Sequence, residues 1–140
     1  MSLKIEEIIE NFQLIDDWEE RYRYLIELGQ ALPELPESDR TSENKVLGCA
    51  SQVWLLHHWQ QDGDKKTLKL QGDSDAHIVR GLVAVMIALY SNKTPAEVLE
   101  IDPIQILSEI GLEQHLTPQR SNGLRSMVER IQNNARAAIE

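Results

Sequence analysis

The only cysteine of the chain, Cys49, lies in a stretch of small residues. Gly48 precedes it and Ala50 and Ser51 follow it, so no bulky neighbour in the turn covers the thiol. The residues on either side have the composition of strands and could hold both ends of the turn. Free cysteines usually pack as small hydrophobic residues, but a thiol at the tip of a turn can be offered to another protein. Cys49 is therefore the first candidate for chemistry, with plain packing as the alternative.

The histidines do not form the pattern of a metal site. His57 and His58 are adjacent on a predicted strand, so they point to opposite faces and cannot chelate one ion together. His77 and His115 have no partner at a ligand spacing, and no CxxC or HExxH motif is present. One cysteine is also too few for an iron-sulfur cluster, which needs about four thiolates. We expect no metal and no cofactor on this chain, and the adjacent histidines have no assigned role.

Two kinds of thiol chemistry remain for Cys49. A Cys-His hydrolase needs an aligned base, and its cysteine usually begins a helix, whereas a predicted strand follows Cys49. Sulfur transfer needs only an accessible nucleophilic sulfur that attacks as in thiol-disulfide exchange. Because the chain has no second thiol, a persulfide on Cys49 could not collapse into an intramolecular disulfide. Sulfur exchange with another protein is the preferred hypothesis, and an independent thiol-dependent enzyme is the alternative.

Composition and charge limit the partners. The chain of 140 residues has a formal net charge of -9, which repels the phosphates of nucleic acids and anionic lipids. The acidic residues are concentrated in the N-terminal third, where they could steer a basic protein partner. The longest apolar run, Leu82 to Tyr90, is too short to span a bilayer, and the acidic start does not resemble a signal peptide. We therefore expect a cytoplasmic protein that binds neither nucleic acid nor a membrane.

The hydrophobic pattern predicts an α+β protein, treated as a single domain over residues 1–140. The spacing of apolar residues and the capping residues predict helices over 4–15, 17–32, 73–90, 94–111 and 117–139. The fourth range holds two short helices, which start at Thr94-Pro95 and Asp102-Pro103. Alternation and a turn at residues 62–64 predict three antiparallel strands over 45–47, 52–60 and 65–71. Asp73 and Asp75 are predicted to cap the long helix that centres the core. In the last helix, Arg125, Arg130 and Arg136 are left for the outer face.

Three motifs also resemble a known family. The first and strongest is Gly48-Cys49-Ala50-Ser51-Gln52-Val53-Trp54, which looks like the Gly-Cys-x-Ser-x-Val-Trp signature of the SufE/CsdE family of sulfur-acceptor proteins. The second block, Gly72 to Leu82, and the third, Leu116 to Leu124, follow in that family's order and spacing. The resemblance spans almost the whole chain.

The resemblance implies a fold, a pathway and partners. The fold would be SufE/NifU-like, with a small three-stranded antiparallel sheet packed against helices. The protein would accept persulfide sulfur from a SufS-like or CsdA-like cysteine desulfurase, stimulate it, and pass the sulfur to an iron-sulfur scaffold or another acceptor. Pyridoxal phosphate would belong to the desulfurase, and the chain would have no turnover of its own.

Roles for individual residues follow from the motif and the turn. Cys49 is the expected nucleophile and persulfide carrier. Gly48 and Ala50 would shape the turn, with possible support from Ser51 and Gln52. Arg120, in the third motif, is predicted to lie near the loop and to favour the thiolate through its fixed positive charge. We also expect the loop to open on docking, with Val46 or Leu47 sheltering the sulfur before then.

Overall fold

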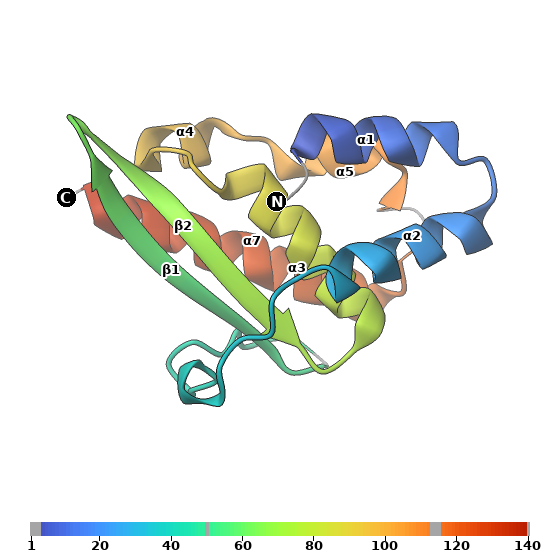
Figure 1. Ribbon diagram of the computed structural model, residues 1–140, viewed down its shortest axis with the longest axis horizontal. Coiled ribbons are helices and arrows are strands. Elements are labelled where there is room, and N and C mark those ends of the chain that lie inside the picture. The colour runs from blue at the N-terminus through green and yellow to red at the C-terminus, as the bar shows by residue number, and fades with distance from the viewer. Residues whose placement is uncertain (1–3, 50, 113–115, 140) are drawn as a thin grey trace.

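The computed structural model of the protein describes residues 4–49, 51–112 and 116–139 (Figure 1). Its elements, in chain order, are α1 (Ile5–Leu14), α2 (Trp18–Gln30), the short 3-10 helix η1 (Glu37–Asp39), β1 (Val53–Asp62), β2 (Lys65–Ser74), α3 (His77–Tyr90), α4 (Pro95–Glu100), α5 (Pro103–Glu109) and α7 (Pro118–Ile139). Helices and an antiparallel sheet together confirm the α+β class predicted from the hydrophobic pattern.

The sheet of the described chain has two strands, and the prediction of three was wrong. Strands β1 and β2 pair antiparallel from Val53 opposite Ser74 to Asp62 opposite Lys65. The predicted third strand, residues 45–47, contributes only an isolated bridge between Lys45 and Trp54. The pairing of residues 45–47 with β1 does not continue, because the next residue, Gly48, has a φ of +91°. This left-handed conformation turns the extended chain away from β1.

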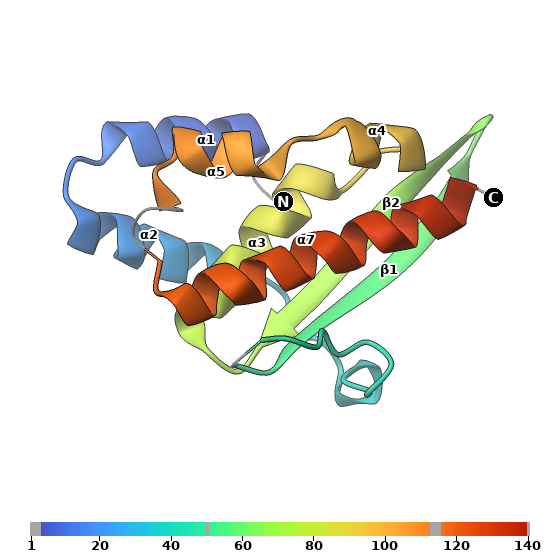
Figure 2. The same cartoon turned by 180° about the vertical axis from the view of Figure 1, so that it is seen from behind.

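One face of the sheet is covered by two helices. Figure 1 shows the hairpin in front of α7 and beside α3, and Figure 2 shows α7 from the opposite side. Leu55, Leu68 and Leu70 are buried on this covered face. On the other face, Trp54 is buried beneath the loop that follows α2, with the guanidinium of Arg40 5.4 Å from its ring centroid. Both faces therefore carry apolar groups, and the two helices cover one of them.

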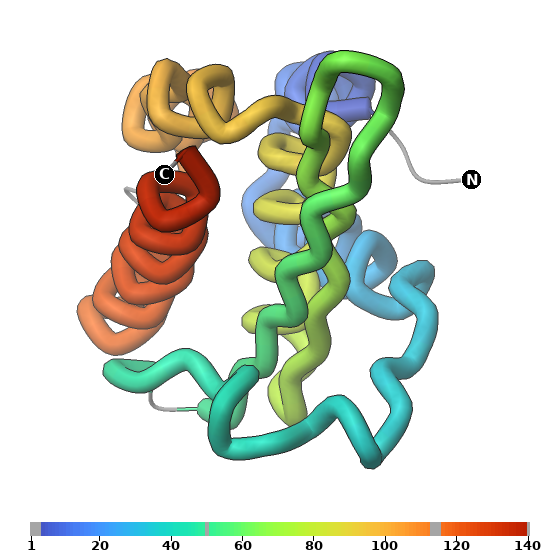
Figure 3. Tube along the Cα trace, turned by 90° about the vertical axis from the view of Figure 1, so that its left-hand side faces the viewer, coloured from blue at the N-terminus to red at the C-terminus, as the bar shows by residue number. Residues whose placement is uncertain are grey.

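Helix α3 is the centre of the core, as its continuous apolar sequence predicts. Figure 3 shows it behind the hairpin, with α7 on one side and α1 and α2 on the other. Its crossing with α2 is close, because a Cβ atom at Gly81 would lie 2.2 Å from the carbonyl oxygen of Leu25. Only glycine fits at such a contact. Within the described ranges, no helix has both the length and the apolar composition needed to cross a membrane.

The short helices begin at the capping residues that the sequence predicts. Thr94 and Glu97 form a reciprocal capping box at α4. The side chain of Asp102 accepts hydrogen bonds from the first turn of α5. Helix α3 ends at Tyr90 as predicted, but its predicted start and caps were wrong, because β2 continues to Ser74 and Ala76 occupies the N-cap without a side-chain hydrogen bond. Asp73 and Asp75 are therefore free for other contacts.

Candidate functional site

Cys49 lies on the loop that leads into β1, half-buried against the first turns of α7. Its sulfur is 3.6 Å from the carbonyl oxygen of Gly123, to which the S–H donates. The thiol opens into a cavity of about 200 Å³. The lining residues are Cys49, Ser51, Val79, Leu82, Thr117, Gln119, Arg120, Gly123 and Met127.

Burial controls the protonation of the thiol in this arrangement. Removal from water disfavours the charged form, so the pKa of Cys49 is raised above its ordinary value. The hydrogen bond to a carbonyl oxygen also requires the protonated form. The thiolate is the nucleophile, so the thiol is held in its less reactive state here. A change in the loop or in its surroundings that returned the thiol to water would lower its pKa and make it more reactive.

Arg120 lines the same cavity as Cys49. Its backbone N–H donates to the side-chain oxygen of Thr117 at 3.3 Å, which fixes the start of α7. Within the described ranges, no carboxylate forms an ion pair with its guanidinium. A cationic side chain without an ion-pair partner among the described residues therefore lines the cavity of Cys49, while burial alone accounts for the raised pKa of Cys49 in this conformation.

The turn before Cys49 requires glycine for two reasons. Gly48 has a φ of +91°, and a Cβ atom there would lie 2.6 Å from the hydroxyl oxygen of Ser126 on α7. That hydroxyl donates to the carbonyl oxygen of Asn122. The sequence indicates a turn at Gly48, but the close approach of α7 is visible only in the fold. Ala50, the other residue expected to shape the turn, lies outside the described residues.

The chain is held again directly after the loop. The backbone N–H of Gln52 donates to the carboxylate of Asp75 at 3.0 Å, and its carbonyl oxygen accepts from the hydroxyl of Ser74 at 2.7 Å. Ser51 lines the cavity, whereas Gln52 does not. Of the two residues expected to support Cys49, Ser51 therefore lines the cavity of the thiol. Gln52 instead anchors the end of the loop through its backbone hydrogen bonds.

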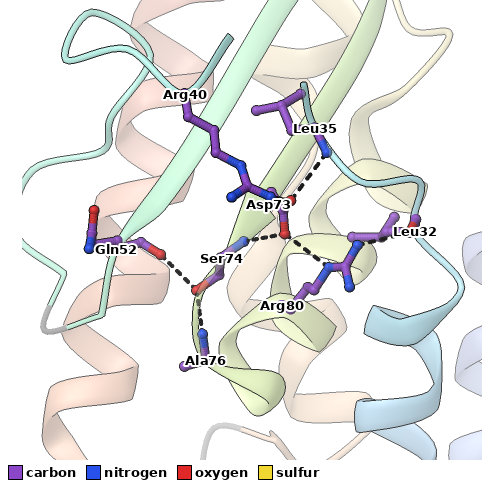
Figure 4. A network of polar contacts seen from close by, with 8 residues as sticks. All are labelled: Leu32, Leu35, Arg40, Gln52, Asp73, Ser74, Ala76 and Arg80. Carbon is purple, nitrogen blue, oxygen red and sulfur yellow. Dashed lines mark hydrogen bonds and ion pairs between the residues drawn. The ribbon is translucent and has the colours of Figure 1, made fainter. Parts of the chain in front are cut away.

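Asp73, predicted as a helix cap, instead joins three segments (Figure 4). One carboxylate oxygen accepts from the backbone N–H of Leu35 at 3.2 Å and from Arg40 at 2.8 Å. The other accepts from the N–H of Ser74 at 2.8 Å and forms an ion pair with Nε of Arg80 at 3.0 Å. Burial alone would raise the pKa of Asp73, but these contacts hold it below its ordinary value. The network fixes the residues 33–40 loop against the end of β2.

Arg130 has a role that differs from its predicted place on the outer face of the last helix. It is half-buried, and its Nη1 donates to the carbonyl oxygen of Lys45 at 3.0 Å. Its Nη2 donates to the carbonyl oxygen of Glu43. Gly123, Met127 and Arg130 recur at the three- and four-residue spacing of one helix face, which was the available signal.

The residues predicted to shelter the sulfur, Val46 or Leu47, were the wrong ones. Leu47 is 79% exposed, and Val46, although buried, does not line the cavity of Cys49. The apolar walls come instead from α3 and α7, through Val79, Leu82 and Met127. The shelter is thus made by elements distant in sequence.

The described histidines do not line the cavity of the thiol. Among the residues that the structure describes, none that lines the cavity is a histidine, and no group of three or more potential ligands could hold a metal ion. His57 is half-buried with no partner for Nε2, and His58 is exposed. His115 lies outside the described residues. A Cys-His pair is therefore not seen in the described part of the chain.

Comparison with known proteins gives matches over nearly the whole length. The family model "SufE: Fe-S metabolism associated domain" matches residues 6–135. An uncharacterised SufE-like protein of Rhizobium etli is 57% identical over 132 residues, 94% of this chain and 89% of that protein. A second, of Rhizobium meliloti, is 53% identical over 135 residues, 96% of each chain. The solution structure of a hypothetical protein from Thermus thermophilus superimposes with a TM-score of 0.73 at 25% identity, covering 99% of this chain and 98% of that one.

Proposed function

Since this chain belongs to the SufE family of Fe-S metabolism associated domains, we propose that Cys49 accepts persulfide sulfur from a cysteine desulfurase. Family membership carries the general role, a sulfur acceptor in iron-sulfur metabolism that works with a cysteine desulfurase. The specific proposal assigns the acceptor atom to the sulfur of Cys49. It rests on one observation, that the chain's single thiol lies in a cavity it shares with Arg120.

The transfer step is a thiol exchange without net oxidation. The thiolate of Cys49 attacks the outer sulfur of the persulfide on the desulfurase cysteine. A new S–S bond forms to Cys49, the S–S bond of the donor breaks, and the desulfurase cysteine leaves as a thiolate with the electron pair. The same exchange with a downstream thiol would then release the sulfur to an iron-sulfur scaffold or another acceptor. Pyridoxal phosphate is required only by the desulfurase, and removal of its sulfur would stimulate its turnover.

The cavity suits both stages of this cycle. Apolar walls from α3 and α7 shield the sulfur, and the raised pKa of Cys49 keeps the empty carrier from reacting with other electrophiles. Arg120 supplies a fixed positive charge for the thiolate or the persulfide anion. We place the protein in the cytoplasm, where reductants maintain the thiol. An independent thiol-dependent enzyme remains the second candidate, but no observation in the described chain favours it.

Intact-mass measurement tests the proposal directly. Wild type and Cys49→Ser are each mixed with a cysteine desulfurase and free cysteine. We expect the mass of one sulfur atom on wild type alone, together with faster desulfurase turnover. If several SufS-like and CsdA-like desulfurases leave the mass of wild type unchanged, the acceptor assignment is wrong.

The role of Arg120 has its own test. We expect Arg120→Ala to accept sulfur more slowly and Arg120→Lys, which keeps the charge, to retain part of the rate. Equal sulfur acceptance in Arg120→Ala and wild type would remove the electrostatic role.

A further inference from the structure

The segment before Cys49 is held along both of its edges. On one edge, the N–H of Val46 donates to Val53 at 2.8 Å, and the carbonyl oxygen of Asn44 accepts from Leu55 at 2.9 Å. The carbonyl oxygen of Lys45 points away from β1, because the C=O and N–H of a trans peptide group point in opposite directions, and the carbonyl oxygen of Glu43 lies in the turn that precedes it. Both accept from the guanidinium of Arg130. The side chain of Arg130 thus supplies the hydrogen-bond donors that a further strand would supply at this edge.

We propose that Arg130 is a positioning residue for Cys49, holding residues 43–45 against α7 and thereby setting how readily the loop exposes the thiol. The consequence of this positioning for sulfur transfer rests on the proposed function. Its effect on the exposure of the thiol does not depend on that function.

The contacts of α7 explain why this clamp would act on Cys49. Gly123 receives the thiol, Ser126 lies against Gly48, and Arg130 binds residues 43–45, so successive turns of one helix contact successive parts of the approach and loop. Figure 3 shows the turquoise segment that precedes β1 reaching the side of α7. After the loop, the backbone of Gln52 is fixed independently by Asp75 and Ser74. Loss of Arg130 would therefore loosen the N-terminal side of the loop, which would then be held by β1 alone, and leave the other side in place.

Arginine is suited to this contact in a way that lysine is not. Its planar guanidinium offers several N–H donors in a fixed geometry, so it can serve two carbonyl oxygens at once. A lysine ammonium has the same charge but is a compact group on a flexible stem, and we expect it to hold one of the two carbonyls. Arg130→Lys should accordingly restore part of what Arg130→Gln removes.

The test measures the reaction of Cys49 with iodoacetamide, which needs no desulfurase. We expect the alkylation rate of Arg130→Gln to rise about tenfold over wild type, because two charge-assisted hydrogen bonds are lost from the closed state. Arg130→Lys should give an intermediate rate. The matched control is Arg125→Gln, an exposed arginine of the same helix, which should react as wild type does.

Hydrogen exchange separates a local effect from general destabilisation. In Arg130→Gln, the amides of residues 43–49 should exchange faster while those of β2 and α3 keep their protection. Unchanged alkylation in Arg130→Gln would overturn the proposal, as would faster exchange spread evenly over the fold. If Arg130→Gln does not fold, the comparison of Arg130→Lys with wild type and Arg125→Gln decides. Failure of sulfur acceptance in the mass experiment would leave these results intact, so the two proposals are tested separately.

Discussion

The sulfur of Cys49 lies 3.6 Å from the carbonyl oxygen of Gly123, a residue 74 positions further along the chain. A carbonyl oxygen accepts a hydrogen bond from the thiol but has nothing to donate to a thiolate. The contact therefore stabilises the protonated form, as burial also does. The resting protein therefore holds its only thiol in the protonated, less reactive form, in a cavity that Arg120 also lines.

The pH dependence of Cys49 alkylation should reflect this environment. Because burial raises the pKa of Cys49, its thiolate fraction at a given pH is smaller than that of a small-molecule thiol. We expect slower alkylation at neutral pH and a rate profile displaced to higher pH, measured with iodoacetamide. Guanidine-unfolded protein serves as the control and should behave as a free thiol. A native profile matching the unfolded one would show that the loop does not shelter the sulfur.

Substitution of Gly48 tests the geometry of the turn. Gly48→Ala should lower the free energy of unfolding by about 1 to 2 kcal/mol, because its φ of +91° is unfavourable for alanine and its Cβ would meet Ser126. Combining it with Ser126→Gly removes the close contact but not the backbone strain. We therefore expect partial recovery in the double variant, with Ser126→Gly alone as the reference in denaturant unfolding. Full stability of Gly48→Ala would contradict the left-handed turn.

The contacts of Asp73 should contribute strongly to the free energy of unfolding, because they hold the residues 33–40 loop against the end of β2. Asp73→Asn removes the charge that pairs with Arg40 and Arg80, and we expect a loss of about 3 kcal/mol because a half-buried arginine is left unpaired. The matched control is Asp75→Asn, an exposed carboxylate with one backbone hydrogen bond, which should lose far less. Equal losses in the two variants, measured by urea unfolding, would argue against the network.

The same carboxylate predicts a loss of stability in acid. The folded pKa of Asp73 is lowered, so its contribution is present above the unfolded pKa of about 3.9 and disappears as the pH falls through the lower folded value. Stability of wild type should therefore fall more steeply below about pH 4 than that of Asp73→Asn.

His57 predicts a separate loss at milder pH. Burial, with a smaller contribution from Arg130, lowers the pKa of His57 from 6.5 to about 4. Between these values the unfolded chain binds a proton that the folded chain does not, so stability falls as the pH drops from 6.5 towards 4, by about 3 kcal/mol at most. Urea unfolding across this range should show the loss in wild type and in His58→Gln, but not in His57→Gln. A pH dependence that survives in His57→Gln would assign it to other groups.

Much of the local structure could be predicted from the chain alone. Apolar spacing identifies α1, α2 and α7, and the caps at Thr94 and Asp102 place the starts of α4 and α5. Such features depend on residues within one or two turns of each other, so the sequence displays them directly. The position of the lone thiol between small residues likewise marks Cys49 as the candidate for chemistry from the sequence alone.

Tertiary structure decided what those elements do for the thiol. The predicted third strand does not form, because Gly48 turns the chain towards α7. Asp73 pairs with arginines from two other segments instead of capping a helix. Arg130 binds carbonyl oxygens 85 and 87 positions earlier, a contact that helical spacing alone does not reveal. The family of the chain and the candidate thiol follow from the sequence alone, because both can be read from short motifs without the fold. The shelter, protonation and positioning of the sulfur arise only from groups that folding brings together.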